Sequence, residues 1–226
     1  MEHLVVLTGA GISAESGIKT FRDADGLWEG HDVMEVATPQ GFYNNPQLVL
    51  EFYNQRRRQL LEVEPNSAHK DLANLEDQFN VSIITQNVDD LHERAGSSNV
   101  THLHGELLKV RSTVNHEYVQ SWTKDLKWGD QCDLGHQLRP HIVWFGEDVP
   151  MIETAMDICA RADKLLIIGT SMQVYPAAGL IDYVPPNTPI YFIDPNPAIH
   201  QIPNLTVIAE TATNGMTQFK QLMANN

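Results

Sequence analysis

The fold of this chain is decided near its start by the stretch His3-Leu4-Val5-Val6-Leu7-Thr8-Gly9-Ala10-Gly11-Ile12-Ser13-Ala14-Glu15-Ser16-Gly17. The apolar run from His3 to Leu7 predicts a buried strand, and the glycine-rich turn after it predicts the start of a helix. Such a turn directs backbone N–H groups and the positive end of a helix toward one point, where an anionic phosphate can bind. The stretch therefore predicts a nucleotide site, and the alternative is a tight strand-to-helix turn without a ligand.

The glycine spacing narrows this prediction. Gly9, Gly11 and Ala14 fit the Gly-x-Gly-x-x-Gly/Ala pattern of dinucleotide-binding turns, in which the second glycine lets a pyrophosphate approach and the third position allows close helix packing. A standard unit continues with a second strand that carries a ribose-binding acid about 20 residues on. Here that region reads Phe21-Arg22-Asp23-Ala24-Asp25-Gly26-Leu27-Trp28 and shows no strand alternation. We expect an insertion in place of the standard second strand.

The rest of the chain repeats the strand-and-helix theme. Further apolar runs end in polar or glycine-containing turns at 81–85, 164–168 and 190–193. Helical stretches alternate with them at 66–79, 150–162 and 214–224. This alternation predicts an α/β fold with a Rossmann-like parallel sheet and helices on both faces. Because ligands bind beyond the carboxyl ends of the strands in such sheets, the polar turns are expected to border one cleft.

Two segments interrupt the alternation and are interpreted as insertions. Residues 23–65 have helical patterning, and residues 109–140 are polar and irregular. We expect both to pack together as a small lobe, beside a large lobe made of 1–22, 66–108 and 141–226. A length of 226 residues suits such a single domain.

Composition limits the partners of the chain. With 29 acidic residues against 15 basic ones and a formal charge of −14, nucleic-acid binding is not expected. A membrane span is not expected either, because no apolar run reaches 18 residues. The two cysteines, Cys132 and Cys159, give no disulfide framework, and without a signal peptide we expect a cytoplasmic protein. The sequence does not indicate an oligomeric state.

Polar side chains directly follow the second predicted strand, in Thr85-Gln86-Asn87-Val88-Asp89-Asp90. Their position at a strand end predicts that they project into the cleft. Asn87, Asp89 or Asp90 could each cap the helix that begins near Leu91, and one of them is expected to do so. The others remain available for a polar ligand.

Two histidines form the next candidate, in His102-Leu103-His104-Gly105. In an extended segment, a spacing of two places both imidazoles on one face. One of them is a candidate acid–base group because imidazole titrates near neutrality, and a structural histidine is the alternative. His-x-His also occurs in metal-dependent hydrolases, but the partner carboxylates of such a site are missing here.

Three further segments carry polar or extended patterns. The segment Arg139-Pro140-His141-Ile142-Val143-Trp144-Phe145-Gly146-Glu147 could accept a peptide as an added strand, or it could be the edge of a core strand. Gly169-Thr170-Ser171 offers another backbone turn for ribose or phosphate. Asp194 lies at a strand end and could accept hydrogen bonds from ribose hydroxyls.

Taken together and in this order, the motifs resemble the sirtuin family of NAD-dependent protein lysine deacylases. The resemblance spans nearly the whole chain and lies in the turn from Gly9 with Phe21-Arg22, in Thr85 to Asp89, in His102 to Gly105, in Arg139 to Glu147 and in Gly169 to Ser171.

The resemblance implies a set of roles, with NAD as co-substrate and an acylated lysine of a protein or peptide as the partner. His104 is implied as the general base, with Asn87 as a second catalytic residue, and the backbone of Val143 as a contact to the acyl-lysine. The implied NAD-binding residues are Gly9, Ala10, Gly11, Ser13, Ala14, Glu15, Phe21, Arg22, Trp28, Gln86, Asn87, Val88, Asp89, Gly169, Thr170, Ser171, Asp194, Pro195, Asn196 and Ala212. In the family reaction, the acyl oxygen attacks the nicotinamide-bearing ribose carbon and nicotinamide leaves. The acyl group then passes to the ribose, which gives free lysine and O-acyl-ADP-ribose.

The small lobe departs from most of the family, whose members carry two Cys-x-x-Cys pairs that bind a structural zinc. The corresponding stretch here, about 109–140, contains Cys132 alone, with His116 and His136 as the nearest other candidates. A structural zinc site normally needs four ligands, so no metal is expected. Apolar side chains are expected to hold the lobe instead, with three candidates in Trp122, Leu126 and Trp128.

A second feature concerns the helical stretch Glu51-Phe52-Tyr53-Asn54-Gln55-Arg56-Arg57-Arg58. Tyr53 and Arg56 are three residues apart and share a helix face, although spacing alone does not choose Arg56 over Arg57. For Arg57 and Arg58 the default interpretation is a solvated basic face. The sirtuin subgroup that favours acidic acyl groups has a Tyr-x-x-Arg motif that matches Tyr53 and Arg56, and Ala24 also resembles that subgroup. This resemblance implies a preference for succinyl-, malonyl- or glutaryl-lysine over acetyl-lysine.

Two other functions use the same NAD cleft. A protein mono-ADP-ribosyltransferase would give the ribose to another nucleophile. A non-catalytic NAD-binding module would bind NAD without releasing nicotinamide, and the presence of His104 argues against it.

Overall fold

The large lobe of the protein is built on a parallel sheet. The computed structural model describes residues 1–19, 27–28, 30–197 and 202–224. In this part of the chain, six parallel strands lie in the order β11-β10-β9-β1-β4-β5. They are β1 (His3–Thr8), β4 (Asn80–Thr85), β5 (Val100–His102), β9 (Lys164–Ile168), β10 (Ile190–Ile193) and β11 (Leu205–Ile208). The chain crosses to both sides of β1, since β1 pairs with β4 on one side and β9 on the other.

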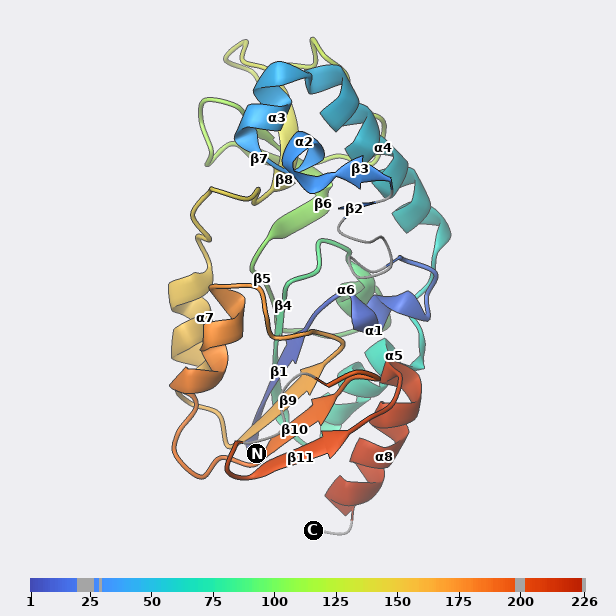
Figure 1. Ribbon diagram of the computed structural model, residues 1–226, viewed down its shortest axis with the longest axis vertical. Coiled ribbons are helices and arrows are strands. Elements are labelled where there is room, and N and C mark those ends of the chain that lie inside the picture. Colours follow the sequence, from blue (N-terminus) through green and yellow to red (C-terminus); the bar gives the residue numbers. More distant parts are fainter. Residues whose placement is uncertain (20–26, 29, 198–201, 225–226) are drawn as a thin grey trace.

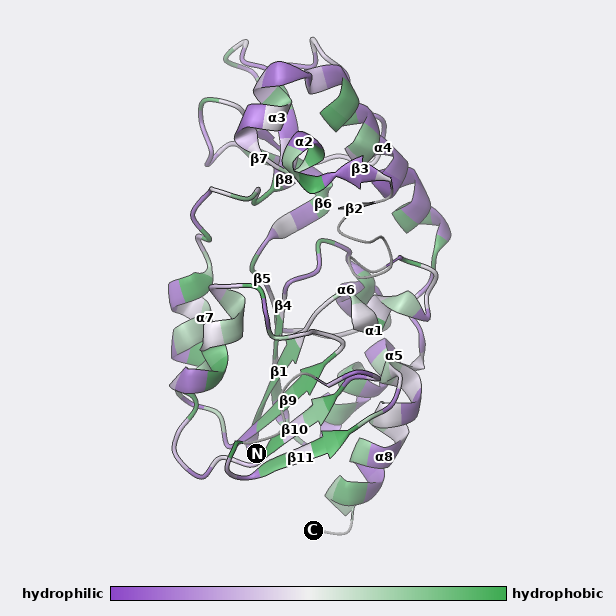
Figure 2. Cartoon of the chain, viewed as in Figure 1, coloured by the Kyte–Doolittle hydropathy of each residue, from purple (hydrophilic) through white to green (hydrophobic). Residues whose placement is uncertain are grey.

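Helices cover both faces of this sheet (Figure 1). They are α1 (Gly11–Ala14), α5 (Ser67–Asn74), η2 (Leu75–Asp77), α6 (Leu91–Ala95), α7 (Ile152–Cys159), η3 (Ala177–Tyr183) and α8 (Ala212–Ala224). Leu4 and Val6 of β1 pack with α5 and α8, whereas Val5 and Leu7 pack with α7 and η3. Burial on both faces explains the continuously apolar strands, which Figure 2 shows. The predicted Rossmann-like α/β fold is confirmed.

The sequence does not predict the two outer strands, β5 and β11. Strand β5 has three residues, and Thr206 and Val207 in the middle of β11 are exposed. Short or half-exposed edge strands lack the long apolar run that reveals a central strand.

The small lobe occupies the upper part of Figure 1. Its strands are β2 (Leu27–Trp28) and β3 (His31–Asp32), and β6 (Gly105–Ser112), β7 (Val119–Ser121) and β8 (Leu138–Ile142). Its helices are α2 (Val33–Val36), α3 (Pro39–Asn44) and α4 (Pro46–Glu62). Strand β6 pairs with β7 and β8 in an antiparallel sheet, in which Gly105 pairs with Ile142. The sheet thus extends on both sides beyond the 109–140 insertion, to the border with the large lobe.

Helix α4 supplies one wall of the functional site. It starts where the Asn45 side chain accepts the Leu48 N–H at 3.2 Å and Pro46 takes a first-turn position, where no intrahelical donor is lost. Phe52 and Tyr53 face a buried apolar cluster that also contains Trp144. None of the helices in the described ranges combines the length and the apolarity needed to cross a membrane.

Candidate active site

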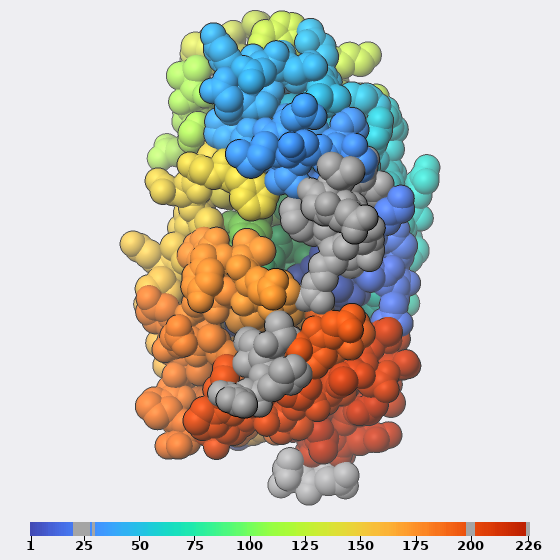
Figure 3. Space-filling view, in the orientation of Figure 1, coloured from blue at the N-terminus to red at the C-terminus, as the bar shows by residue number. Residues whose placement is uncertain are grey.

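A cleft of about 780 Å³ lies between the two lobes. Figure 3 shows the surface hollowed there, with the green part of the chain recessed behind the yellow and orange parts. The predicted site residues that line it are Gly9, Ala10, Gly11, Ala14, Glu15, Trp28, Tyr53, Arg56, Gln86, Asn87, Val88, Asp89, His104, Val143, Gly169, Thr170, Ser171, Asp194, Pro195, Asn196 and Ala212. Ser13 is buried beneath the cleft rather than lining it. Phe21, Arg22 and Ala24 lie outside the described residues.

The glycine turn after β1 packs directly against the turn after β9. The Gly9 N–H donates to the Ile168 carbonyl at 3.2 Å, and the Gly11 N–H donates to the Gly169 carbonyl at 2.8 Å. A Cβ added to Gly11 would lie 2.6 Å from Gly169 Cα, a distance that side chains do not tolerate. Gly169 itself has a φ of +65°, which favours glycine. The glycines therefore allow the two turns to come into contact at the floor of the cleft.

A buried polar network lies beneath this turn. The Ser13 hydroxyl donates to Asp89 Oδ2 at 3.0 Å and accepts from Asn87 Nδ2 at 3.2 Å. Asn87 Nδ2 also donates to the Gly9 carbonyl at 3.1 Å. Burial raises the pKa of Asp89 to about 6. The network ties the strand end of β4 to the turn after β1.

Asp89 also fills the capping role that the sequence left open. Its Oδ1 accepts the Leu91 N–H at 3.2 Å, at the start of α6. Asp90 precedes the helix, but its side chain makes no capping hydrogen bond. Of the three candidates, Asp89 is therefore the one that supports the helix start.

Two buried histidines that the sequence did not single out complete the network. His92 Nε2 lies 3.0 Å from Thr8 Oγ1, and His69 Nε2 lies 3.5 Å from Ser13 Oγ. Their ring centroids are 5.0 Å apart. Burial lowers the pKa of His69 to about 4 and that of His92 well below its usual range, so both are neutral at neutral pH. Each is a single histidine on a helix, and only the packing of α5 against α6 brings them together.

His104 projects from the loop between β5 and β6. Its Nδ1 lies 3.0 Å from the Gln86 carbonyl oxygen, which can only accept, so Nδ1 carries the hydrogen. In the neutral ring Nε2 then has a free lone pair. Burial lowers the pKa of His104, although the bond to Gln86 opposes that shift. His104 is therefore a neutral base in the cleft at neutral pH.

His102 has a different environment. Its Nδ1 lies 3.1 Å from the Asn87 carbonyl and its Nε2 lies 2.8 Å from Glu93 Oε1. Burial opposes charge on this ring, but the Glu93 carboxylate, the Asn87 carbonyl and Glu106 together raise the pKa of His102. Both ring nitrogens are engaged, which leaves His104 as the histidine of the pair that can act on a ligand.

The three arginines of α4 have three different environments. Arg56 lines the cleft, with its guanidinium carbon 4.4 Å from the Phe52 ring centroid. Arg57 is only 1% exposed and donates to the Leu107 carbonyl at 3.2 Å and to Asn54 Oδ1 at 2.7 Å. The solvated interpretation of Arg57 is therefore wrong, because the helix turns this side chain into the small lobe. Arg58 is exposed as expected, and it pairs with Glu51 and Asp125 at the surface.

The segment after β8 forms the other wall near α4. The Val143 N–H donates to the His104 carbonyl at 2.9 Å, and the Phe145 N–H donates to the Ala37 carbonyl at 2.9 Å. Glu147 Oε2 accepts the Trp144 N–H at 2.8 Å. The Glu147 carboxylate also pairs with Arg139 at 2.6 Å and Arg111 at 3.0 Å. These bonds hold the segment beside the cleft, outside the regular ladder of β8.

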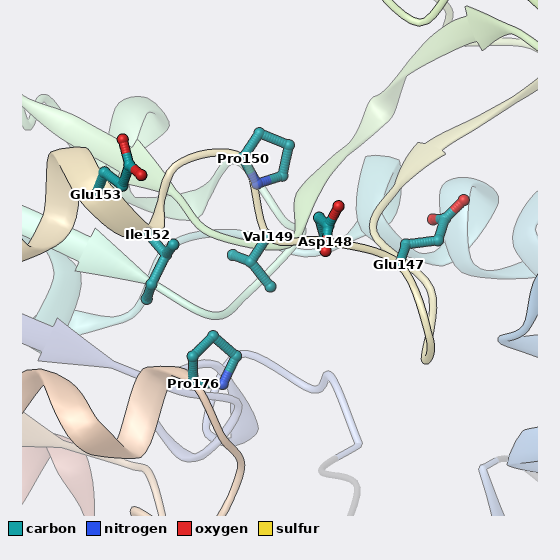
Figure 4. A pocket seen from close by; sticks show the side chains of 7 residues that line it. All are labelled: Glu147, Asp148, Val149, Pro150, Ile152, Glu153 and Pro176. Atoms are coloured by element: carbon teal, nitrogen blue, oxygen red, sulfur yellow. The ribbon is translucent and has the colours of Figure 1, made fainter.

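A second, shallower hollow of about 550 Å³ adjoins the cleft. Glu147, Val149 and Pro176 line both. Figure 4 shows the side chains of Val149, Ile152 and Pro176 gathered around it, with Glu147 and Glu153 at its two ends. The hollow thus extends the cleft along the segment that follows β8.

At the opposite end of the cleft, polar groups fix the turns after β10 and before α8. Asp194 is buried, and its Oδ1 accepts the Asn196 N–H at 2.8 Å. The Glu15 carboxylate accepts the Thr213 N–H at 2.9 Å and its hydroxyl at 2.7 Å. Glu15 therefore holds the first turn of α8, in addition to lining the cleft.

The parallel sheet and its strand-end cleft place this chain among α/β nucleotide-binding proteins with a second, smaller lobe. Comparison with known proteins agrees: a model of the Sir2 family matches residues 9–176. The chain is 60% identical to an NAD-dependent protein deacylase of Helicobacter pylori, over 96% of this chain and 95% of that protein. It is 55% identical to an NAD-dependent protein deacylase of Bacteroides thetaiotaomicron, over 99% and 98% of the two chains. The solved complex of a Sir2 homolog with NAD superposes with a TM-score of 0.86 at 40% identity, and the match covers 99% of this chain and 90% of that one. The chain belongs to the Sir2 family.

Proposed function

We propose that this protein removes acyl groups from protein lysines with NAD as co-substrate and releases nicotinamide and O-acyl-ADP-ribose. The observation that carries the proposal is His104, a neutral base that lines the cleft and is held by the Gln86 carbonyl. The names of its relatives support it, because those proteins match over nearly their whole length.

NAD fits the cleft on chemical grounds. The turns after β1 and β9 line the cleft mainly with glycines and short side chains, which leaves room for a pyrophosphate. Asp194 and Asn196 lie at one end of the cleft, where an adenosine would have polar partners. Asn87 is the further catalytic residue that we propose, because its Oδ1 receives no hydrogen bond from the described residues and so stays available to orient ribose and nicotinamide.

His104 moves the proton in this proposal. Its Nε2 accepts the proton of a ribose hydroxyl, while Nδ1 keeps its hydrogen bond to Gln86. The Gln86 carbonyl then stabilises the imidazolium that forms. The backbone of Val143, held to the carbonyl of His104, is the proposed contact to the acyl-lysine.

We further propose that acidic acyl groups are preferred over acetyl. Arg56 lines the cleft, whereas Arg57 is buried in the small lobe and Arg58 lies at the surface. The Tyr53 hydroxyl lies on the same helix face, and burial raises the pKa of this phenol so that it keeps its hydrogen. Tyr53 is 0% exposed, so a carboxylate reaches it only when the cleft wall adjusts. A succinyl, malonyl or glutaryl carboxylate can pair with Arg56, and an acetyl group cannot.

The test is a peptide panel with NAD, in which mass spectrometry follows both the peptide and the nucleotide product. The wild type is expected to prefer succinyl, malonyl or glutaryl peptides, and Arg56→Met should lower the ratio of desuccinylation to deacetylation roughly 10- to 150-fold, the worth of a charged hydrogen bond. Arg58→Met is the matched control and should leave the ratio unchanged, because Arg58 faces solvent. An unchanged ratio in Arg56→Met rejects the assignment. Radioactive label retained on protein from labelled NAD would instead favour mono-ADP-ribosyl transfer.

Finally, we propose that apolar packing holds the small lobe without a metal. Leu50, Val110, Leu126, Cys132 and Leu138 form a buried cluster, with Trp122 packed against it. Trp128 is exposed and lies beside Phe42. In the described ranges, no group of three or more His, Cys, Asp or Glu residues is placed to hold a metal ion. Stoichiometric zinc in purified protein would contradict this proposal.

A further inference from the structure

One contact joins the two walls of the cleft next to Arg56. The indole Nε1 of Trp144, from the segment after β8, lies 2.9 Å from the hydroxyl of Tyr53 on α4. Both residues line the cleft, and both are buried. The contact therefore lies where the acyl group of a substrate is proposed to end.

The direction of this hydrogen bond is fixed by chemistry. An indole N–H can only donate, so the phenol oxygen is the acceptor and its own hydrogen must point elsewhere. Among the residues that the structure describes, Trp144 is the single hydrogen-bond partner of this hydroxyl. The phenol hydrogen can therefore be donated to an acceptor from the cleft once the cleft wall adjusts to admit it. A carboxylate is such an acceptor, and the methyl group of an acetyl is not.

Several contacts hold the Trp144 indole in the position from which it donates to Tyr53. The Arg139 guanidinium carbon lies 3.4 Å from the indole centroid, and the Phe42 ring centroid lies 5.3 Å away. The backbone N–H of Trp144 donates to Glu147, whose carboxylate also binds Arg139. The side chain and the backbone of Trp144 are therefore anchored through the same ion pair.

From this geometry we infer that Trp144 is a positioning residue for acyl selectivity: its indole N–H occupies the Tyr53 oxygen and leaves the Tyr53 hydrogen to bind the carboxylate of an acidic acyl group. The inference rests on the acidic-acyl preference proposed above and adds a residue that acts through Tyr53 rather than on the substrate.

A double-mutant cycle tests the inference. Trp144→Phe removes the donor and keeps an aromatic ring, and it should lower the ratio of kcat/KM for succinyl over acetyl peptide roughly 3- to 10-fold, the worth of one neutral hydrogen bond. In a Tyr53→Phe background the same change should have no further effect on that ratio, because the group it orients is gone. Trp128→Phe, an exposed tryptophan of the same lobe, is the matched control and should change nothing.

The outcomes separate this inference from the proposed function. A wild type without any acidic preference overturns both. A wild type that prefers succinyl, with the ratio unchanged in Trp144→Phe, overturns the role of Trp144 alone. An equal loss in the presence and absence of the Tyr53 hydroxyl also overturns it, since that loss would come from packing.

A second measurement needs no Trp144 variant, in case that variant fails to fold. The indole ¹⁵N–¹H resonance of Trp144, assigned by elimination with variants of the other tryptophans, should shift in Tyr53→Phe. With NAD present, it should also shift more on adding succinyl peptide than on adding acetyl peptide. If the Trp144 resonance has the same position in Tyr53→Phe as in the wild type, the inference is overturned.

Discussion

One end of the cleft is formed mainly by backbone and the other mainly by side chains. The nucleotide end consists of backbone turns at the strand ends, where Gly11 and Gly169 touch without side chains between them. The end proposed to hold the acyl group (the acyl end) consists of side chains: Arg56 and Tyr53 of α4 line it, and the Trp144 indole donates to the Tyr53 hydroxyl at 2.9 Å. The first end depends on close main-chain contact, and the second depends on which side chains the small lobe presents.

The two ends of the cleft should therefore tolerate different substitutions. A side chain at the acyl end can be exchanged while the chain behind it stays in place, so selectivity should change before activity is lost. At the nucleotide end, the floor, the buried Ser13–Asp89 pair and the base His104 are connected through the strand ends. Changes there should affect binding, turnover or stability directly.

The largest expected effect belongs to His104, the proposed general base. His104→Ala should lower kcat about 10²- to 10⁴-fold, the usual contribution of a general base, while NAD binding remains. The control is His116→Ala, an exposed histidine of the small lobe. Calorimetry of NAD binding and steady-state kinetics check both statements, and near-normal deacylation would remove His104 from the mechanism.

The same residue predicts a pH profile. Burial lowers the pKa of His104, so the neutral base persists below the usual histidine range. In the wild type kcat/KM should be flat near neutrality and should fall only as the pH drops through the lowered pKa. A fall that begins above pH 7 would contradict the assigned environment.

The next largest effect concerns the buried carboxylate at the nucleotide end. Burial raises the pKa of Asp89 to about 6 in the folded protein, whereas an aspartate that is not buried has a pKa of 3.8. The folded state thus holds the proton more tightly, and stability falls as the pH rises from about 4 to about 6, by up to about 3 kcal/mol. Asp89→Asn should lack this loss and be more stable than the wild type at pH 7. Urea unfolding across that pH range measures it, with the exposed Asp157→Asn as the matched control.

The smallest of these effects is at the turn contact. Gly11→Ala places a Cβ against the backbone of Gly169, which should cost about 1–3 kcal/mol of stability and weaken NAD binding. Gly179→Ala is the control, because a Cβ there meets only the Tyr175 ring at 3.6 Å. If Gly11→Ala bound NAD like the wild type, the contrast between the two ends of the cleft would be lost.

Much of the fold could be predicted from the sequence because the central strands are buried on both faces. Their mainly apolar runs indicated β1, β4, β9 and β10, whereas the short or half-exposed β5 and β11 gave no such signal. The cleft was predicted from the polar turns that end these strands, and these turns line it. His69 and His92 were missed because each is a single polar residue on a helix, and burial of such a residue is visible only after packing.

By itself, the sequence determined the parallel α/β fold, the glycine turn and the polar strand ends of a Sir2-family protein. These features depend on the local periodicity of apolar residues and on short motifs, which can be recognised without knowledge of the packing. Only the tertiary structure decided which of Arg56, Arg57 and Arg58 faces the cleft, which of two histidines keeps a free ring nitrogen, and that Trp144 meets Tyr53. Those outcomes depend on how α4, the loop after β5 and the segment after β8 pack together, and residues 91 positions apart carry no local signal of their contact.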